Sequence, residues 1–101
     1  MNIKNTLNTP KVPFDLDGYI LHSEKQIELV HLTLKPDEKL AEHKNPFDVI
    51  FFVVEGEGIL SVEKQQHILK TGDTLKITSE KKRGWKNLSN QELRLLVIKL
   101  L

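Results

Sequence analysis

The side chains with the clearest chemical potential lie in two segments of the chain, one around His43 and one around Arg83. An imidazole such as that of His43 can act as a general acid or base or as a metal ligand, and Asn45 would share its face of a strand. The planar guanidinium of Arg83 can bind a carboxylate or phosphate through paired hydrogen bonds, and Trp85 offers a ring for stacking. These residue types indicate recognition of a small anion, or proton transfer by the imidazole.

Composition excludes several other kinds of site. The chain has no cysteine, so it has no disulfide, no thiolate nucleophile and no cysteine-bound zinc. The other histidines, His22, His31 and His67, show no ligand spacing and are interpreted as structural or surface residues. The basic segment 81–86 contains a tryptophan that could stack on bases, but it is short, and a net charge of +1 gives no general attraction for nucleic acid or anionic membranes.

The composition is that of one small globular domain. A chain of 101 residues that is 39% hydrophobic and 29% charged can form one core and is neither disordered nor fibrous in type. The longest apolar run, residues 49–54, is far shorter than the roughly 20 residues that a membrane-spanning helix needs. Because the N-terminal segment has no continuous apolar stretch, we expect a cytoplasmic protein.

Short apolar runs alternate with turn residues at the spacing typical of all-β sandwiches and barrels. Strands are predicted at residues 26–34, 49–55, 59–63, 66–70, 74–78, 83–88 and 92–100. The run 49–55 suits a strand covered on both faces, and the turns after residues 55 and 88 predict two hairpins. Residues 37–44 are too few for a stable helix and predict a turn with a short strand. Residues 1–18 are polar and predict an N-terminal arm or edge segment, which leaves residues 19–101 as the domain.

Over roughly residues 30–100 the sequence resembles the cupins, small jelly-roll barrels that are recognised by two motifs. The first motif reads G-x5-H-x-H-x3-E-x6-G, and the second reads G-x5-P-x-G-x2-H-x3-N. Both motifs thread onto the chain without gaps, the first from Asp37 to Gly56 and the second from Gly72 to Asn87. The resemblance implies an all-β fold, a single-domain jelly-roll barrel of short antiparallel strands with little or no helix.

In cupins the two His and the Glu of the first motif, with the His of the second, bind a divalent metal. Here those positions are held by His43, Asn45, Val49 and Arg83. Only His43 is a ligand of the family's type, and Arg83 is a permanent cation that would repel a metal ion. The nearest carboxylate, Asp48, is one residue away from the Glu position and is expected to face the other side unless a β-bulge turns it inward. We therefore expect no bound metal and no other cofactor.

The resemblance also implies which side chains point into the barrel. The expected ligand-binding residues are His43, Asn45, Val49, Phe51, Arg83 and Trp85. In this interpretation Arg83 binds a carboxylate or phosphate and Trp85 stacks on the ligand, while His43 or Asn45 fixes its orientation. Two structural alternatives stay open, because Trp85 and Phe51 can fill a small barrel completely and Arg83 can extend into solvent.

We predict a metal-independent cupin that binds or senses a small molecule, with a small anionic metabolite as the ligand. It is expected to form a homodimer, in which the arm could add a strand to the partner's sheet edge. The alternative is an enzyme, either a metal-dependent dioxygenase or isomerase with atypical ligands or a metal-free isomerase or lyase that uses His43 as general acid or base. A third interpretation is an interaction protein whose barrel is only a scaffold. The cupin fold carries many functions and does not itself decide among these.

Overall fold

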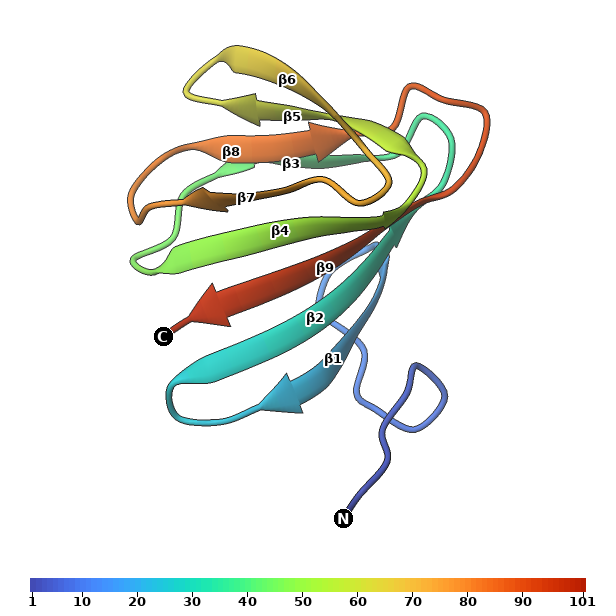
Figure 1. Ribbon diagram of the computed structural model, residues 1–101, viewed down its shortest axis with the longest axis vertical. Coiled ribbons are helices and arrows are strands. Elements are labelled where there is room, and N and C mark those ends of the chain that lie inside the picture. Colours follow the sequence, from blue (N-terminus) through green and yellow to red (C-terminus); the bar gives the residue numbers. More distant parts are fainter.

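The computed structural model describes residues 1–101 as two antiparallel sheets that face each other, with no helix (Figure 1). The strands are β1 (Asp17–Ser23), β2 (Ile27–Leu34), β3 (Lys39–His43), β4 (Asp48–Glu55), β5 (Glu57–Val62), β6 (Gln65–Lys70), β7 (Thr74–Ile77), β8 (Arg83–Lys86) and β9 (Leu93–Leu100). One sheet has the order β1-β2-β9-β4-β7 and the other β3-β8-β5-β6. This is the predicted jelly-roll fold. The chain contains no helix that could cross a membrane.

The two predicted hairpins are wrong, because the chain changes sheets at both places. β4 and β9 lie in the five-stranded sheet, whereas β5 and β8, which adjoin them in sequence, lie in the four-stranded sheet. The two crossing connections pack closely against each other. A Cβ atom on Gly56, whose φ is 96°, would lie 2.5 Å from the carbonyl oxygen of Glu92. Gly56 therefore marks a close crossing between the sheets rather than a hairpin turn.

The core lies between the sheets and is made by alternate residues of their strands. From β2, β4 and β9 the buried hydrophobic residues are Val30, Leu32, Leu34, Val49, Phe51, Val53, Leu93, Leu95 and Val97. The four-stranded sheet adds Trp85, whose ring meets Phe51 edge to face with 5.4 Å between the ring centroids. The prediction that residues 49–55 are covered on both faces is wrong for the single chain, because Phe52 and Val54 point outward and are 36% and 38% exposed.

The turns confirm the threading of both motifs. Four positions where the cupin motifs have glycine are occupied here by Asp37, Gly56, Gly72 and Glu80. All four have a positive φ, of 68°, 96°, 91° and 68° respectively. A positive φ favours glycine because side chains with a Cβ are strained there. The backbone therefore keeps the turn geometry of the motifs even where Asp37 and Glu80 have replaced the glycine.

Asn87, the last residue of the second motif, holds the β8–β9 connection in place. Its fully buried amide nitrogen donates to the carbonyl oxygens of Leu34 at 2.9 Å and Gln91 at 2.7 Å. Its amide oxygen accepts from the backbone N–H of Ser89 at 3.0 Å and from the Ser89 hydroxyl at 2.7 Å. Asn87 therefore joins the loop that follows β8 to the end of β2 in the facing sheet.

The N-terminal segment, predicted as an arm or an edge segment, runs in part along the edge of the five-stranded sheet. Strand β1 begins at Asp17 and is the edge of the five-stranded sheet, a strand that the sequence prediction missed. The segment before it turns back along this edge. The N–H of Val12 donates to the oxygen of Gly18 at 2.9 Å, and the N–H of Ile20 donates to the oxygen of Pro10 at 2.8 Å. Part of the predicted arm thus covers the edge of its own sheet.

Candidate functional site

A cavity of about 600 Å³ lies between the two sheets, within the size range typical of small-molecule sites. Its apolar lining comes from both sheets and from the segment before β1: Val12, Pro13, Phe14, Ile20, Val30, Leu32, Leu40, Ala41, Phe51 and Val97. Its polar lining consists of Glu28, Glu42, His43, Asn45, Arg83 and Lys99. A mostly apolar wall with a few polar groups is the usual composition of a site for a small organic ligand.

A β-bulge in β3 places His43 at this cavity. Leu40 pairs with Trp85, and His43 pairs with Arg83, so β3 uses one more residue than β8 over the same distance. In a regular strand Leu40 and His43, which are three residues apart, would face opposite sides of the sheet, so the bulge is what brings both side chains to the cavity. Gly84 permits the close approach of the two strands, since a Cβ atom there would lie 2.7 Å from the Leu40 carbonyl oxygen.

Arg83 is a buried cation without an anionic partner. Its residue is only 4% exposed, and no ion pair of the chain includes it. With the Asn45 amide oriented so that its oxygen faces the guanidinium, that oxygen accepts from Nη2 of Arg83 at 2.6 Å. The buried Nε of Arg83 has no hydrogen-bond partner. Burial lowers the pKa of Arg83, because desolvation disfavours the charged form.

His43 lies at the exposed rim of the cavity. Its Nδ1 is 3.0 Å from the carbonyl oxygen of Ala41, which can only accept a hydrogen bond, so Nδ1 carries the proton. In the neutral imidazole Nε2 is then the unprotonated nitrogen. His43 is therefore arranged to accept a proton or a hydrogen bond through Nε2.

A second charged group in the cavity was missed by the sequence analysis. Glu28 on β2 and Lys99 on β9 form an ion pair with 3.0 Å between Oε2 and Nζ, and both side chains are largely buried. The Nζ of Lys99 also lies 5.9 Å from the centroid of the Phe47 ring. Both residues could have been found from strand parity, because residues two apart share a face of the sheet. Glu28 lies two residues before buried Val30, and Lys99 lies two residues after buried Val97. No comparable sequence signal marks residues 12–14 as lining residues.

The predicted site residues divide into two groups. His43, Asn45, Phe51 and Arg83 line the one cavity, which the structure therefore assembles from three separate strands and a loop. Val49 and Trp85 do not line it and are buried in the core. The indole Nε1 of Trp85 has no hydrogen-bond partner, and its ring packs edge to face against Phe51. This geometry favours the structural explanation for Trp85, whereas the binding roles of the four lining residues stay predictions.

The residues at the four metal-ligand positions of the motifs do not fit a divalent metal. The guanidinium of Arg83 occupies one position and bonds to Asn45 at another, and Val49 is packed in the core. Asp48 faces outward, where it accepts from the N–H of Ser79 at 2.8 Å and lies 3.4 Å from Nζ of Lys76. The bulge that could have turned Asp48 inward is absent, since Asp48 and Val49 pair regularly with Leu100 and Lys99 of β9. No group of three His, Asp or Glu side chains with metal-binding spacing occurs in the chain.

The fold is shared with several solved structures. A predicted oxalate decarboxylase from Thermotoga maritima is 17% identical, with a TM-score of 0.87 and 99% of both chains covered. The polyketide cyclase RemF from Streptomyces resistomycificus is 14% identical, with a TM-score of 0.85, 99% of this chain and 79% of RemF covered. KdgF from a Halomonas species is 18% identical, with a TM-score of 0.74, and 83% of this chain and 77% of KdgF are covered. At such low identities the likeness shows the fold alone.

No curated protein matches the sequence. The Cupin_2 family model, which describes a cupin domain, matches residues 30–99. This range contains both motifs and every strand from β3 to β8. It agrees with the jelly-roll topology and with the positive φ at the motif glycine positions. The chain therefore belongs to the cupin family.

Proposed function

We propose that this chain is a metal-independent cupin of the cytoplasm that binds or senses a small anionic molecule in the cavity between its sheets. The observation that carries the proposal is the environment of Arg83, which is buried, has no carboxylate partner and has a free Nε. A buried donor without a partner costs about 1–3 kcal/mol. A carboxylate or phosphate that accepts from this guanidinium would offset that cost, and it would neutralise the charge as well.

The rest of the cavity suggests which kind of anion fits best. The walls beside Arg83 are apolar, with Phe51 and Leu40 among the lining residues, so the ligand should carry an apolar body next to its acidic group. Asn45 already bonds to the guanidinium and would hold it in position for the acidic group. An open cavity is also a feature that a barrel serving only as a scaffold does not need.

Isothermal titration calorimetry tests this function with a panel of small aliphatic and aromatic carboxylates, their phosphate analogues and the matching neutral amides. We expect a carboxylate or phosphate to bind and its amide not to bind. The Arg83→Gln variant should bind at least about tenfold more weakly, because a hydrogen bond to a charged group contributes about 1.5–3 kcal/mol. Lys82→Gln, which removes an exposed neighbouring cation, is the matched control and should bind as the wild type does. Equal binding by wild type and Arg83→Gln, or binding of no acid in the panel, would refute the proposal.

A second candidate function is supported by His43. Its Nε2 can accept a proton, and His43 lines the same cavity as Arg83, which is the arrangement that a metal-free isomerase or lyase would need. The metal-dependent version lacks such support, because its donor set is missing. The test is solvent deuterium exchange at the α-carbon of a bound carboxylate, followed by NMR. Exchange that is lost in His43→Gln, with binding retained, would establish the enzyme; exchange equal in wild type and His43→Gln would exclude this role.

A further inference from the structure

The cavity that holds Arg83 also contains an ion pair, and this pair is unusually enclosed. Oε2 of Glu28 lies 3.0 Å from Nζ of Lys99, and the two side chains are only 21% and 29% exposed. In every other ion pair of the chain both side chains are at least 34% exposed. An enclosed ion pair is costly because both charges lose water, and apolar residues of similar size would be as stable there. The stability of the fold therefore does not explain the pair.

The ion pair lies on the sheet that faces Arg83, at the same end of the barrel. β2 and β9 belong to the five-stranded sheet and β8 to the other, and all three charged side chains line one cavity. The amide of Asn45 bonds to Arg83, while the ring centroid of Phe47 lies 5.9 Å from Nζ. Asn45 and Phe47 both belong to the connection between β3 and β4 (Figure 1), so the two cations lie beside that connection. Because facing sheets pack about 10 Å apart, a ligand that contacts both sets of charges has its polar groups a few bonds apart.

Both partners of the ion pair keep unused capacity for hydrogen bonds. The ammonium group of Lys99 has three N–H groups, and the bond to Glu28 uses one of them. The carboxylate of Glu28 can accept about four hydrogen bonds. Lys99 supplies one, and the hydroxyl of Ser23, which donates to Oε1 at 3.2 Å, supplies another. A ligand in the cavity therefore meets a charged donor and a charged acceptor that lie 3.0 Å apart.

A hydroxyl group fits this donor and acceptor better than a charged group or an alkyl group does. The hydroxyl can donate its hydrogen to Glu28 while its oxygen accepts from Lys99, so it satisfies both partners without adding charge. A second carboxylate on the ligand would be repelled by Glu28, and an ammonium group would be repelled by Lys99. An alkyl group would displace the water that the two charges bind and would form no hydrogen bond in return.

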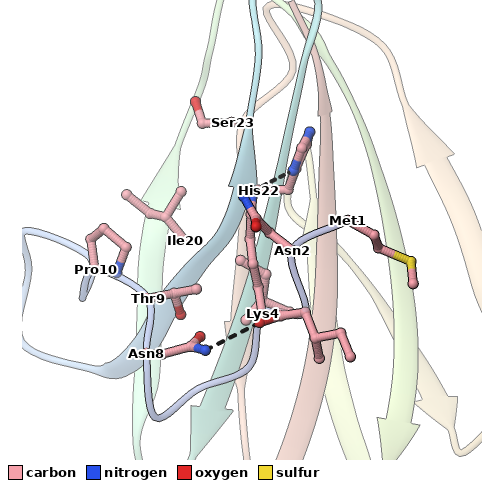
Figure 2. Close-up of a pocket in the computed structure, with 11 residues that line it drawn as sticks. Met1, Asn2, Lys4, Asn8, Thr9, Pro10, Ile20, His22 and Ser23 are labelled. Atoms are coloured by element: carbon pink, nitrogen blue, oxygen red, sulfur yellow. Dashed lines mark hydrogen bonds between the residues drawn. The ribbon is translucent and has the colours of Figure 1, made fainter.

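A second cavity of about 600 Å³, between residues 1–10 and β1, has no comparable pair. Figure 2 shows Lys4 and His22 bonded to each other there, with Nζ donating to Nδ1 at 2.7 Å. Nε2 of His22 in turn donates to Oε1 of Glu24 at 2.6 Å. The side chains of His22 and Glu24 are 42% and 61% exposed, so water can satisfy their remaining capacity. Enclosure together with unused hydrogen-bonding capacity therefore distinguishes the pair that faces Arg83.

We propose that Glu28 and Lys99 select, among small acids, those that carry a hydroxyl group a few carbons away from the acidic group. This selectivity rests on the proposed function, in which the acidic group of the ligand binds Arg83. The guanidinium on one sheet holds the acidic group, and the ion pair on the facing sheet holds the hydroxyl. Glu28 and Lys99 are thus specificity-determining residues, and the cavity takes a small hydroxy acid in preference to an unsubstituted acid or a dicarboxylate.

Isothermal titration calorimetry with straight-chain carboxylic acids of about four to six carbons tests the selectivity. At each length the terminal carbon is a methyl group or carries a hydroxyl or an ammonium group, or it is a second carboxylate. We expect the hydroxy acid of at least one length to bind at least about tenfold more tightly than the other three acids of that length, because hydrogen bonds to charged groups are strong. Equal binding of the hydroxy and unsubstituted acids at every length would overturn the selectivity and leave the proposed function intact. Binding of none of these acids would refute both.

Variants connect the selectivity to the ion pair. Glu28→Met combined with Lys99→Met should bind the hydroxy and unsubstituted acids equally and keep the circular dichroism spectrum, because apolar residues can replace an enclosed ion pair. Glu55→Met combined with Arg94→Met is the matched control; it removes an exposed ion pair of the same sheet and should keep the tenfold preference. Glu28→Met alone should shift the preference to the dicarboxylic acid, since Lys99 then lacks its partner. A hydroxyl preference that persists without the ion pair, or that is lost equally in the control, would overturn the proposal.

Discussion

Replacing Arg83 with methionine should leave the ligand-free protein as stable as the wild type or make it more stable. The substitution removes a buried guanidinium whose Nε has no partner, a penalty of about 1–3 kcal/mol. It also removes the 2.6 Å bond to Asn45, which contributes about 1.5–3 kcal/mol, but the half-buried amide of Asn45 can bond to water instead. Methionine has a similar length and adapts to apolar surroundings such as Phe51.

The free energy of unfolding should therefore change by between zero and about +1 kcal/mol, which corresponds to a rise in Tm of up to about 8 °C for a domain of this size. Urea denaturation followed by circular dichroism measures the change. Arg94→Met is the matched control, because Arg94 is an exposed arginine paired with Glu55 and Glu92, and its loss should alter the free energy by less than about 0.5 kcal/mol. If Arg83→Met lowers the free energy of unfolding by more than about 2 kcal/mol, the guanidinium serves the fold, and the argument for an anion-binding role loses its basis.

Two further predictions concern the fold. Asn87→Leu should lower the free energy of unfolding by about 2–4 kcal/mol, because it leaves the buried carbonyl of Leu34 without its donor and frees the β8–β9 connection. Urea denaturation measures this loss, and a loss below about 1 kcal/mol would contradict the prediction. Stability should also fall in mild acid, because the pKa of His31 is lowered in the folded chain. Burial lowers this pKa most and the charge of Arg94 lowers it further, while the charge of Asp17 opposes the shift. As the pH falls below the ordinary value of about 6.5, the unfolded chain gains a proton that the folded chain does not yet bind, so the free energy of unfolding decreases until the lower folded-state pKa is passed. Urea midpoints between about pH 7.5 and pH 5.5 test this, and the slope should be smaller in His31→Gln; an equal slope in both proteins would assign the effect to other groups.

The sequence predicted the strands well where side-chain alternation and turn residues act together. The turns predicted at Asp37, Gly56 and Gly72 all have a positive φ, and Glu80, which the sequence marked only as a motif position, has one too. Strand β1 was missed because its residues, from Asp17 to Ser23, include polar and turn-forming types. An edge strand is stabilised mainly by backbone hydrogen bonds to its one neighbour, and composition reports these poorly. The prediction of two hairpins was wrong for a related reason. A turn residue does not tell whether the next strand returns to the same sheet or crosses to the facing one.

The candidate site was predictable in its central residues and less so in its extent. Arg83, Asn45 and His43 line one cavity because the motif positions they occupy point inward. Glu28 and Lys99 could have been identified as lining residues from strand parity alone. The absence of Trp85 from the cavity lining could not have been found in this way. Whether a large ring reaches a cavity or lies beneath it depends on packing depth, and strand parity gives only the side of the sheet.

The bulge in β3 means that this site can tolerate a change in chain length. Leu40 and His43 are three residues apart, and they reach the same side of the sheet because the bulge accommodates the additional residue between them. Loss of one residue between them would leave the two side chains two positions apart in a regular strand, so His43 would still pair with Arg83 on the same side of the sheet. Relatives on the same barrel could therefore present a rim histidine at this place from a strand that is one residue shorter. Among such relatives, the length of β3 should be compared before the identity of the residues that it carries.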